Sequence, residues 1–425
     1  MSDSMSDAAE STENVVSTGG MPIPRISIHA FMNRADNRNN LSNACKDRRM
    51  AKVTCEIHEG DIATATEHFK DAPTPNLLFV EVPETPQQII SSLQGLAEVC
   101  DPGTQVVLIG GLNDISTYRE FMRQGISEYL VSPVGTVQYI ETLAVLYADP
   151  ATQPKAKLHC FVGAKGGVGS SLISHNVAWC ISEKLNESTI ILDLDLSFGT
   201  SGLDFNLDSS GRGIIEALLE PNRLDDVLLN RLIAKPTDRL ALFIAPSSLE
   251  DGFDPPIKSL EKILEVVRAN YAHVVIDLPH IWNNWARTLL TMSDEVILTV
   301  TPDLVCLRNG KNIFDYLIAQ RPNDTKPRVI LNMTESPKRP EIPVKEFTDA
   351  LGVPPTAILT HDNALFGAAS NNGQMLGEVD PKNKNSETMM TLASMLTKRN
   401  VALNTEVKSK SPFAPLLALL KGQKA

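Results

Sequence analysis

The chain has 425 residues, of which 42% are hydrophobic and 21% charged, and its formal net charge is −12. This length predicts two domains of ordinary size, and the acidic balance argues against a broad nucleic-acid-binding surface. No apolar run approaches the roughly 18–20 residues of a membrane span, and residues 1–20 lack the apolar core of a signal peptide. We therefore expect a cytoplasmic protein.

The cysteines are scattered along the chain without a C-x-x-C pair: Cys45, Cys55, Cys100, Cys160, Cys180 and Cys306. We interpret them as buried thiols in a reducing compartment rather than as ligands of a metal.

Residues 1–22 are small and polar, and we expect them to form a disordered tail. Beyond them, short apolar strands alternate with amphipathic helices, which predicts a parallel sheet covered on both faces. The arginine-rich residues 35–49 fit either a solvated helix or loop, or a basic docking surface. The expected strands are 26–32, 52–57, 76–82, 105–109 and 128–131, and the expected helices are 61–69, 85–99, 115–124 and 134–147.

The order and lengths of these elements resemble a response-regulator receiver domain, over residues 23–148. The segment Tyr129-Leu-Val-Ser-Pro-Val134 is similar to the receiver's fifth strand and the proline after it, but Ser132 replaces the receiver's lysine. Glu81 stands where a phosphoacceptor aspartate would, and no acidic pair follows the first strand to hold Mg²⁺. The resemblance therefore implies a pseudo-receiver that serves protein contact rather than phosphotransfer.

A proline-containing polar linker, residues 149–157, precedes the expected second domain, residues 158–402. This domain opens with Phe161-Val-Gly-Ala-Lys-Gly-Gly-Val-Gly-Ser-Ser171, which follows an apolar strand and precedes apolar residues at helical spacing. A glycine-rich turn between a strand and a helix N-terminus presents backbone N–H groups to a phosphate. Its glycines let the backbone approach the anion, and the helix dipole favours negative charge.

This loop departs from the standard phosphate-binding pattern, G-x-x-x-x-G-K-[ST]. Ser170 takes the place of the phosphate-binding lysine, whereas Lys165 stands early in the loop. The arrangement resembles the deviant Walker A motif of the ParA/MinD ATPase superfamily, and the resemblance covers about residues 157–400. It implies that Lys165 is the signature lysine, which reaches across a dimer to the partner's nucleotide. The alternative is a glycine turn that merely connects strand to helix.

Carboxylates follow two apolar strands of this domain. Asp193 and Asp195 come at the end of the strand 189–192, and Asp277 ends an apolar strand as a Walker B carboxylate does, where it can bind the hydration shell of Mg²⁺. The superfamily resemblance implies water activation by Asp195, with Asp193 in support, and adenine contact by Asn332. Solvated acids at strand ends are the alternative reading of these carboxylates.

The predicted site has a nucleotide cradle, a catalytic group and a metal-binding group, and the implied cofactors are ATP and Mg²⁺. Because Ser170 cannot neutralise phosphate charge, we expect ATP binding with weak hydrolysis. The catalytic residues are Asp195, Asp193 and Lys165, and the metal ligands are Ser171, Asp195 and Asp277. The nucleotide-binding residues are Gly163, Lys165, Gly166, Gly167, Val168, Gly169, Ser170, Ser171, Asp277 and Asn332.

Residues 403–425 form an expected C-terminal tail with an apolar stretch from Pro412 to Lys421, flanked by lysines. This tail fits either partner docking and packing, or peripheral contact with a membrane surface.

A receiver-like domain followed by this ATPase variant resembles the TadZ/CpaE family of pilus assembly proteins. The resemblance implies two doubly wound α/β parallel-sheet domains, a flavodoxin-like receiver and a ParA/MinD-type P-loop domain. It also implies a bacterial cytoplasmic factor for Flp-type (tight adherence) pili, at the cell pole or the inner-membrane face. The implied partners are a second copy of the chain, the pilus secretion ATPase and inner-membrane platform proteins. An active partitioning ATPase and a nucleotide-free scaffold are the alternatives.

Overall fold

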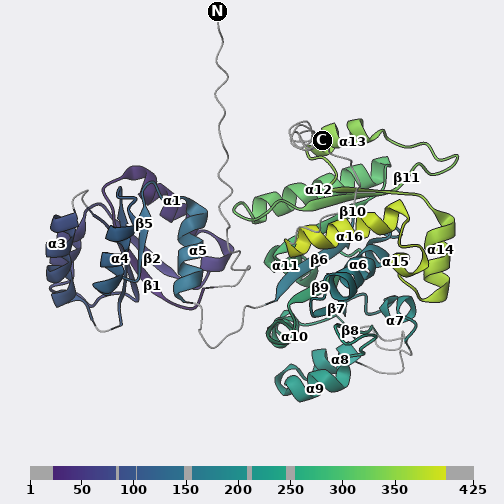
Figure 1. Ribbon diagram of the computed structural model, residues 1–425, viewed down its shortest axis with the longest axis horizontal. Coiled ribbons are helices and arrows are strands. Elements are labelled where there is room, and N and C mark those ends of the chain that lie inside the picture. Colours follow the sequence, from purple (N-terminus) through teal and green to yellow (C-terminus); the bar gives the residue numbers. More distant parts are fainter. Residues whose placement is uncertain are drawn as a thin grey trace, which may run out of the picture.

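The computed structural model describes residues 23–82, 86–101, 103–147, 156–207, 213–245 and 254–398. They form two lobes, each built on a parallel sheet with helices on both faces (Figure 1). The expected tails, 1–22 and 403–425, lie outside the described residues, as does most of the expected linker. None of the helices in the described part of the chain is long and apolar enough to cross a membrane.

The first sheet has the strand order β2-β1-β3-β4-β5, and all of its strands are parallel. This is the flavodoxin-like order of receiver folds, so the predicted fold class is confirmed. Helices α1 and α5 pack on one face, and α2, α3 and α4 on the other. The strands are β1 (Ser27–Phe31), β2 (Thr54–His58), β3 (Leu77–Glu81), β4 (Gln105–Gly110) and β5 (Glu128–Val131). The helices are α1 (Ala35–Cys45), α2 (Ile62–His68), α3 (Pro86–Val99), α4 (Ile115–Arg123) and α5 (Thr136–Leu146), with a 3₁₀ turn η1 (Arg48–Met50).

The second sheet has the order β12-β11-β10-β6-β9-β7-β8, again all parallel. Its central strands are mostly apolar because helices cover both faces. The strands are β6 (Lys157–Gly163), β7 (Thr189–Asp193), β8 (Leu240–Phe243), β9 (His273–Asp277), β10 (Glu295–Val300), β11 (Arg328–Thr334) and β12 (Ala357–Thr360).

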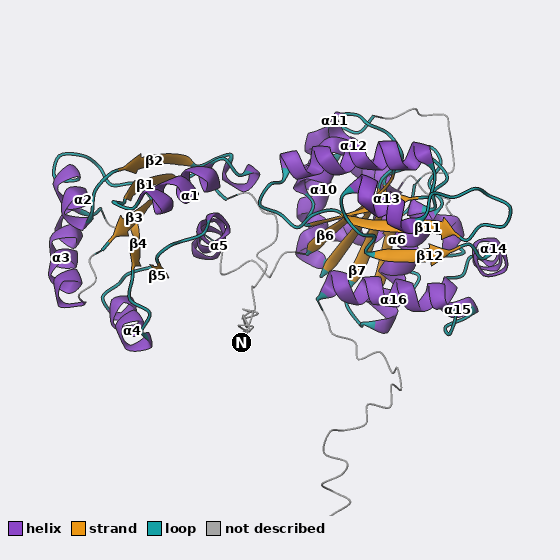
Figure 2. Ribbon diagram, turned by 90° about the horizontal axis from the view of Figure 1, so that it is seen from above, coloured by secondary structure: helices purple, strands orange, loops and turns teal. Residues whose placement is uncertain are grey.

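Two sets of helices cover this second sheet. Figure 2 shows α12 and α16 on opposite sides of it, and the two hydrophobic clusters of the lobe divide in the same way. The first set includes α8 (Gly213–Leu219), α10 (Ile257–Asn270), α11 (Asn284–Met292), α12 (Leu304–Gln320) and α13 (Val344–Leu351), with the short α9 (Asp226–Leu232) beside α8. The second set includes α6 (Ser170–Trp179), α14 (Asn363–Asn372), α15 (Leu376–Val379) and α16 (Lys384–Thr397), with the one-turn α7 (Ser201–Asp204) against α6 and α14.

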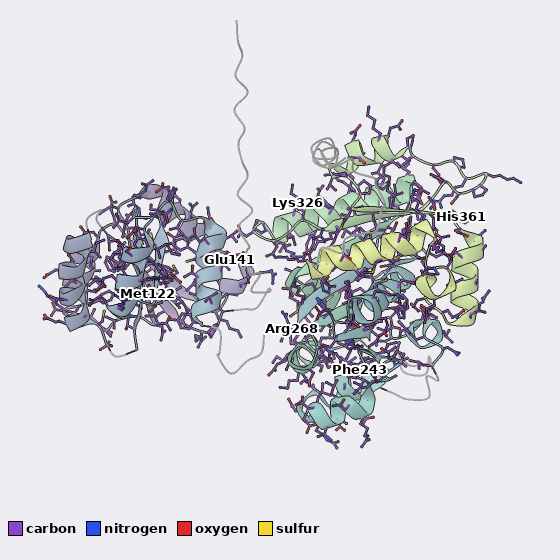
Figure 3. All side chains as sticks on the ribbon, viewed as in Figure 1. Met122, Glu141, Phe243, Arg268, Lys326 and His361 are labelled. Carbon is purple, nitrogen blue, oxygen red and sulfur yellow. The ribbon has the colours of Figure 1, made fainter. Side chains whose placement is uncertain are left out.

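The lobes meet through polar contacts at the turn after α1. The Arg48 guanidinium lies 2.9 Å from the Asp324 carboxylate, and Asn323 donates a hydrogen bond of 2.9 Å to Asp47. Figure 3 places Glu141 and Lys326 on the facing sides of the two lobes. The basic end of residues 35–49 thus docks onto the chain's own second lobe, whereas Leu41 and the rest of one face of α1 pack into the first core.

The cysteines differ in part from expectation. All six are free thiols, but only Cys160, Cys180 and Cys306 are buried, and the other three are half-buried. Cys45 ends α1 and Cys55 lies on β2, at the edge of the first sheet, where both pack against the core while partly exposed.

Candidate nucleotide-binding site

The predicted site residues gather at the carboxyl edge of the second sheet. Gly163 of β6 pairs with Thr299 of β10, and Phe161 of β6 pairs with Asp277 at the end of β9. Asp193, at the end of β7, is the register partner of Asp277. The strand order reverses direction at β6, and ligands of open α/β sheets bind at such a point, outside the carboxyl ends of the strands.

The loop between β6 and α6 requires glycine at two positions. Gly169, directly before α6, has a φ of 85°, and an added Cβ would lie 2.7 Å from the Asn332 amide nitrogen. A Cβ on Gly163 would lie 2.6 Å from the Val168 side chain, which is itself buried. The glycine spacing therefore follows from a tight turn closed over a buried valine.

Side chains from other elements hold the loop carbonyls. His280 contacts the Gly163 carbonyl at 2.9 Å, Asn309 donates to the Ala164 carbonyl at 2.9 Å, and Asn332 donates to the Val168 carbonyl at 2.8 Å. Within the described residues, the N–H groups of Lys165, Gly166, Gly167 and Gly169 have no hydrogen-bond acceptor. The loop is thus fixed in shape with free amide donors before a helix N-terminus, which is an anion-binding arrangement.

Asn332 has a supporting position that the sequence did not reveal. Its side chain is buried, and its amide oxygen accepts a hydrogen bond of 2.8 Å from the Met333 N–H. Both ends of the amide are therefore engaged in holding the loop, and adenine contact stays a prediction.

The Asp277 carboxylate is buried and without a hydrogen-bond donor. Its residue is 1% exposed, and among the described residues no well-aligned hydrogen bond reaches either oxygen, although the His175 Nε2 atom lies 3.5 Å from one of them. Burial, with the charges of Asp193 and Asp195, raises the Asp277 pKa to about 7, against the opposing effects of His175 and the Ser171 hydroxyl. An unpartnered buried carboxylate is unfavourable unless a cation compensates it, and carboxylate and hydroxyl oxygens are the ligands that Mg²⁺ prefers. Asp277 and Ser171 therefore fit a magnesium ion.

His175 belongs to the site, although the sequence reading did not select it. The fully buried imidazole lies 2.7 Å from Asp204 through Nδ1 and 3.5 Å from Asp277 through Nε2. Burial alone lowers its pKa, but the bond to Asp204 and the charge of Asp277 outweigh this and raise it. A protonated His175 offsets the negative charge of the carboxylates. The available signal was its spacing of four residues from Ser171, which places both on one face of α6.

The two aspartates after β7 have different environments. Asp193 is buried and accepts hydrogen bonds from the Ser201 N–H at 3.1 Å, the Ser201 hydroxyl at 2.7 Å and the Asp195 N–H at 3.2 Å. It thereby fixes the loop that carries Asp195. Asp195 is half-buried and accepts only from the Phe198 N–H, at 3.0 Å, so it is the more open carboxylate. The catalytic role of both and the metal-binding role of Asp195 stay predictions.

Lys165 pairs within its own chain. Its ammonium lies 2.7 Å from the carboxylate of Asp303, which also contacts Arg339 at 3.1 Å and caps α12 through the Cys306 N–H. Burial alone would raise the Asp303 pKa, but the bonds from Lys165 and Thr301 outweigh it and lower the pKa to about 2. In the single chain, the predicted signature lysine is therefore held at the N-terminus of α12.

The carboxyl edge of the first sheet is closed by hydrogen bonds. Glu81 is 8% exposed, and its carboxylate accepts from the Asn33 N–H, from the Arg34 N–H at 2.9 Å and from the Asn37 amide at 3.0 Å. The Asn37 amide also donates to the Ser132 hydroxyl at 3.0 Å. Glu81 thus links β3 to the loop after β1, and the absence of phosphotransfer stays a prediction.

Sequence similarity connects the second lobe to ATPases. Residues 156–322 match a family model described as an AAA domain. The septum site-determining protein MinD of Bacillus subtilis (strain 168) is 23% identical over 269 residues, which cover 59% of this chain and 93% of that protein. A solved MinD from Pyrococcus horikoshii OT3, complexed with Mg-ADP, shares the fold with a TM-score of 0.50 at 18% identity, over 57% of this chain and 96% of that one.

A second relationship is closer in sequence and shorter in extent. The pilus assembly protein CpaE of Caulobacter crescentus CB15, whose crystal structure is known, is 43% identical and is covered over 98% of its solved chain. That chain corresponds to 30% of this one, with a TM-score of 0.30, so the relationship rests on the sequence identity rather than on a superposition of the whole molecule. This chain therefore belongs to the CpaE family of pilus assembly proteins, with an ATPase domain of the ParA/MinD type.

Proposed function

We propose that this chain is an ATP-binding assembly factor for Flp-type pili that works as a nucleotide-dependent dimer. The observation that carries the proposal is the buried carboxylate of Asp277, which accepts no well-aligned hydrogen bond among the described residues and lies beside Ser171 and a loop with free N–H donors. A cation and an anion are both needed to complete such a site, and Mg²⁺ with a nucleotide phosphate supplies both.

Within this site, the residues would divide the work of binding. The loop amides and the N-terminus of α6 would hold the phosphates, and Ser171 and Asp277 would hold Mg²⁺, which neutralises phosphate charge when bound. In the free protein, His175 lies 3.5 Å from Asp277, and the bond to Asp204 and the charge of Asp277 raise the His175 pKa, which favours its protonated form. Asp193 keeps the loop after β7 in place, and Asp195 is left open for a water molecule.

Hydrolysis at this site is expected to be weak. Ser170 occupies the lysine position of a standard loop, and its buried hydroxyl has no partner among the described residues. The loop's own lysine, Lys165, is paired with Asp303. Without a fixed cation at the phosphates, the charge that develops during phosphoryl transfer is stabilised less well. Bound ATP would therefore persist as a ligand that favours the dimer.

A second copy would complete each site through Lys165. The ion pair with Asp303 is about two-thirds buried on the lysine side, with 37% of the side chain exposed, and a pair of this kind contributes only a modest free energy. Lys165 can therefore leave Asp303 for a nucleotide phosphate in the partner. The resulting dimer would recruit the pilus secretion ATPase and inner-membrane platform proteins at the cell pole or the inner-membrane face, as membership of the CpaE family supports.

Light scattering of the full chain tests the dimer. We expect a monomer with Mg²⁺ alone or with ADP, and a dimer with ATP and Mg²⁺. Lys165→Ala should stay monomeric while still binding ATP, whereas Lys258→Ala, an exposed lysine on α10, should behave as the wild type. Equal dimer fractions for wild type and Lys165→Ala would refute the role of Lys165. An unchanged mass with no retained nucleotide would support a nucleotide-free scaffold instead.

A further inference from the structure

Three histidines gather at the edge of the first sheet, far from the nucleotide site in sequence. They are His29 on β1, His58 at the end of β2 and His68 at the end of α2, and each offers a ring nitrogen within 4.8 Å of the others. In the parallel pairing of β1 and β2, His29 lies opposite Glu56, and Phe31 lies opposite His58. Because side chains alternate along a strand, all four project from the same face of the sheet.

We propose that this histidine cluster binds a first-row transition-metal dication of zinc type. The His29 Nδ1 and His58 Nε2 atoms are 3.4 Å apart. Zinc–nitrogen bonds of about 2.0–2.1 Å in a tetrahedral site place neighbouring nitrogens roughly 3.3–3.4 Å apart. Two of the three imidazoles therefore already have the spacing of zinc ligands, and the third offers a ring nitrogen within 4.8 Å of both. Imidazole nitrogen is a preferred ligand of such borderline ions.

Glu56 supplies the negative charge that a dication needs. Its carboxylate lies 3.8 Å from His29 Nε2 and 3.8 Å from His58 Nε2. Metal-binding histidines commonly donate their second ring N–H to a carboxylate, which fixes the tautomer and directs the other nitrogen toward the metal. Glu56 is placed to do this for His29, leaving Nδ1 for the ion. We assign it as a positioning residue and leave the fourth ligand position to water.

The rings are held by packing and remain reachable. The His58 ring stacks on Phe31 with centroids 4.7 Å apart, and Phe69 meets the His68 ring edge-on at 4.9 Å. His29 and His58 are half-buried and His68 is exposed. Burial lowers the pKa of the His29 and His58 imidazoles.

A metal at this position would tie β1, β2 and α2 together. β2 is an edge strand with a neighbour on one side only, so a link from it to α2 stabilises the least supported side of the sheet. Purely aromatic packing of the three rings is the competing explanation, and it predicts no affinity for metal. The proposal is independent of the proposed nucleotide binding.

Metal titration of the full chain separates these explanations. The chain is stripped with a chelator and titrated with Zn²⁺ by calorimetry in excess Mg²⁺, which leaves the oxygen-ligand site saturated. We expect one Zn²⁺ per chain and a raised melting temperature. His58→Ala, and separately His68→Gln at an exposed position that folding does not need, should each lower the Zn²⁺ affinity by at least about tenfold. His361→Gln, a matched histidine change in the second lobe, should leave the affinity unchanged (Figure 3).

Cobalt substitution checks the ligand type, because half-buried Cys45 and Cys55 lie in the same domain. We expect Co²⁺ to show visible bands without a thiolate charge-transfer band, and to lose them in His68→Gln. Failure of the wild type to bind Zn²⁺, affinity unchanged in both histidine variants, or a thiolate band that disappears in Cys55→Ser would each overturn the proposal.

Discussion

The two lobes are both doubly wound parallel sheets, yet their carboxyl edges differ. In the first sheet, the acid at the edge is Glu81, and three donors from the loop after β1 and from α1 satisfy it. In the second sheet, the acid is Asp277, which is more deeply buried and has no donor among the described residues. The acid of the first sheet is held by hydrogen bonds from the protein itself, whereas the acid of the second sheet is left free to bind a ligand.

This difference shows that one architecture can carry either a binding site or a structural link, depending on the residues next to the acid. The Asn37 side chain, on α1, forms hydrogen bonds with Glu81, Ser132 and the Val134 N–H. These bonds occupy the groups that stand where a receiver domain has its phosphoacceptor and its lysine. No amide side chain reaches Asp277, and the loop amides beside it stay free. The fold alone therefore does not determine function.

The largest expected effect concerns Asp277. Asp277→Asn should lower the affinity for Mg-ATP by at least about 100-fold, since even the partners of metal ligands contribute roughly 10–100-fold. The free energy of unfolding should not fall, because burial disfavours the charged form of Asp277 and raises its pKa to about 7. Calorimetric titration and urea denaturation measure the two quantities. If Asp277→Asn binds Mg-ATP with the affinity of the wild type, Asp277 is not part of a nucleotide site, and its role is structural like that of Glu81.

Glu81→Ala tests the first sheet, where we expect the change to lower stability and to leave nucleotide binding unchanged. We expect a loss of about 2–4 kcal/mol in the free energy of unfolding, because three donors lose a buried acceptor. Mg-ATP affinity should stay unchanged. Urea denaturation measures the loss, and Glu98→Ala, an exposed acid on α3, serves as the matched control. A stability equal to that of the control would mean that Glu81 is not a structural link.

Asp303, which pairs with Lys165 of the predicted nucleotide-binding loop, gives a pH-dependent test. Its pKa is lowered from 3.8 to about 2, so the charged carboxylate stabilises the fold above pH 3.8, and this contribution is lost as the pH falls towards 2. Asp303→Asn keeps the helix cap and removes the charge, and it should lower stability by about 2 kcal/mol at pH 7. Urea denaturation across pH should show the gap to wild type closing below pH 3.8. A gap that is constant with pH would argue against the ion pair with Lys165.

The smallest expected effect is a gain of activity. Ser170→Lys restores a cation at the phosphates and should raise ATP turnover on the order of tenfold, part of what one well-placed donor supplies. A steady-state phosphate-release assay measures it, with Ser170→Ala as the control without a new charge. Turnover that stays flat would place the limit on hydrolysis elsewhere, for example at the Asp195 loop.

Local sequence signals predicted most of the elements. Asp61 caps α2 through the Ala63 and Thr64 N–H groups, as its position before the helix indicated. Buried parallel strands such as β7 and β9 appear as apolar runs that end in aspartate, so both the sheet and its carboxyl edge were readable. Helices α7, α9 and α11 to α16 of the second lobe were not predicted, and neither was the polar junction between the lobes.

The contacts that complete the site depend on residues distant in sequence. Asn332 holds a loop 164 positions away, and Lys165 meets an acid 138 positions away. The meeting of His175 with Asp277 likewise depends on β6 and β9 being neighbours, which periodicity along the chain does not reveal. Sequence patterns thus locate candidate residues, and the sheet order determines which of them meet.

The most direct test of the account is a calorimetric titration of the full chain with ATP, with Mg²⁺ and then with a chelator in its place. If the second edge is an open site, one ATP binds per chain, and binding weakens strongly when Mg²⁺ is removed. If ATP does not bind, or binds equally well without Mg²⁺, Asp277 is not a metal ligand. The difference between Glu81 and Asp277 would then not separate a structural edge from a binding site.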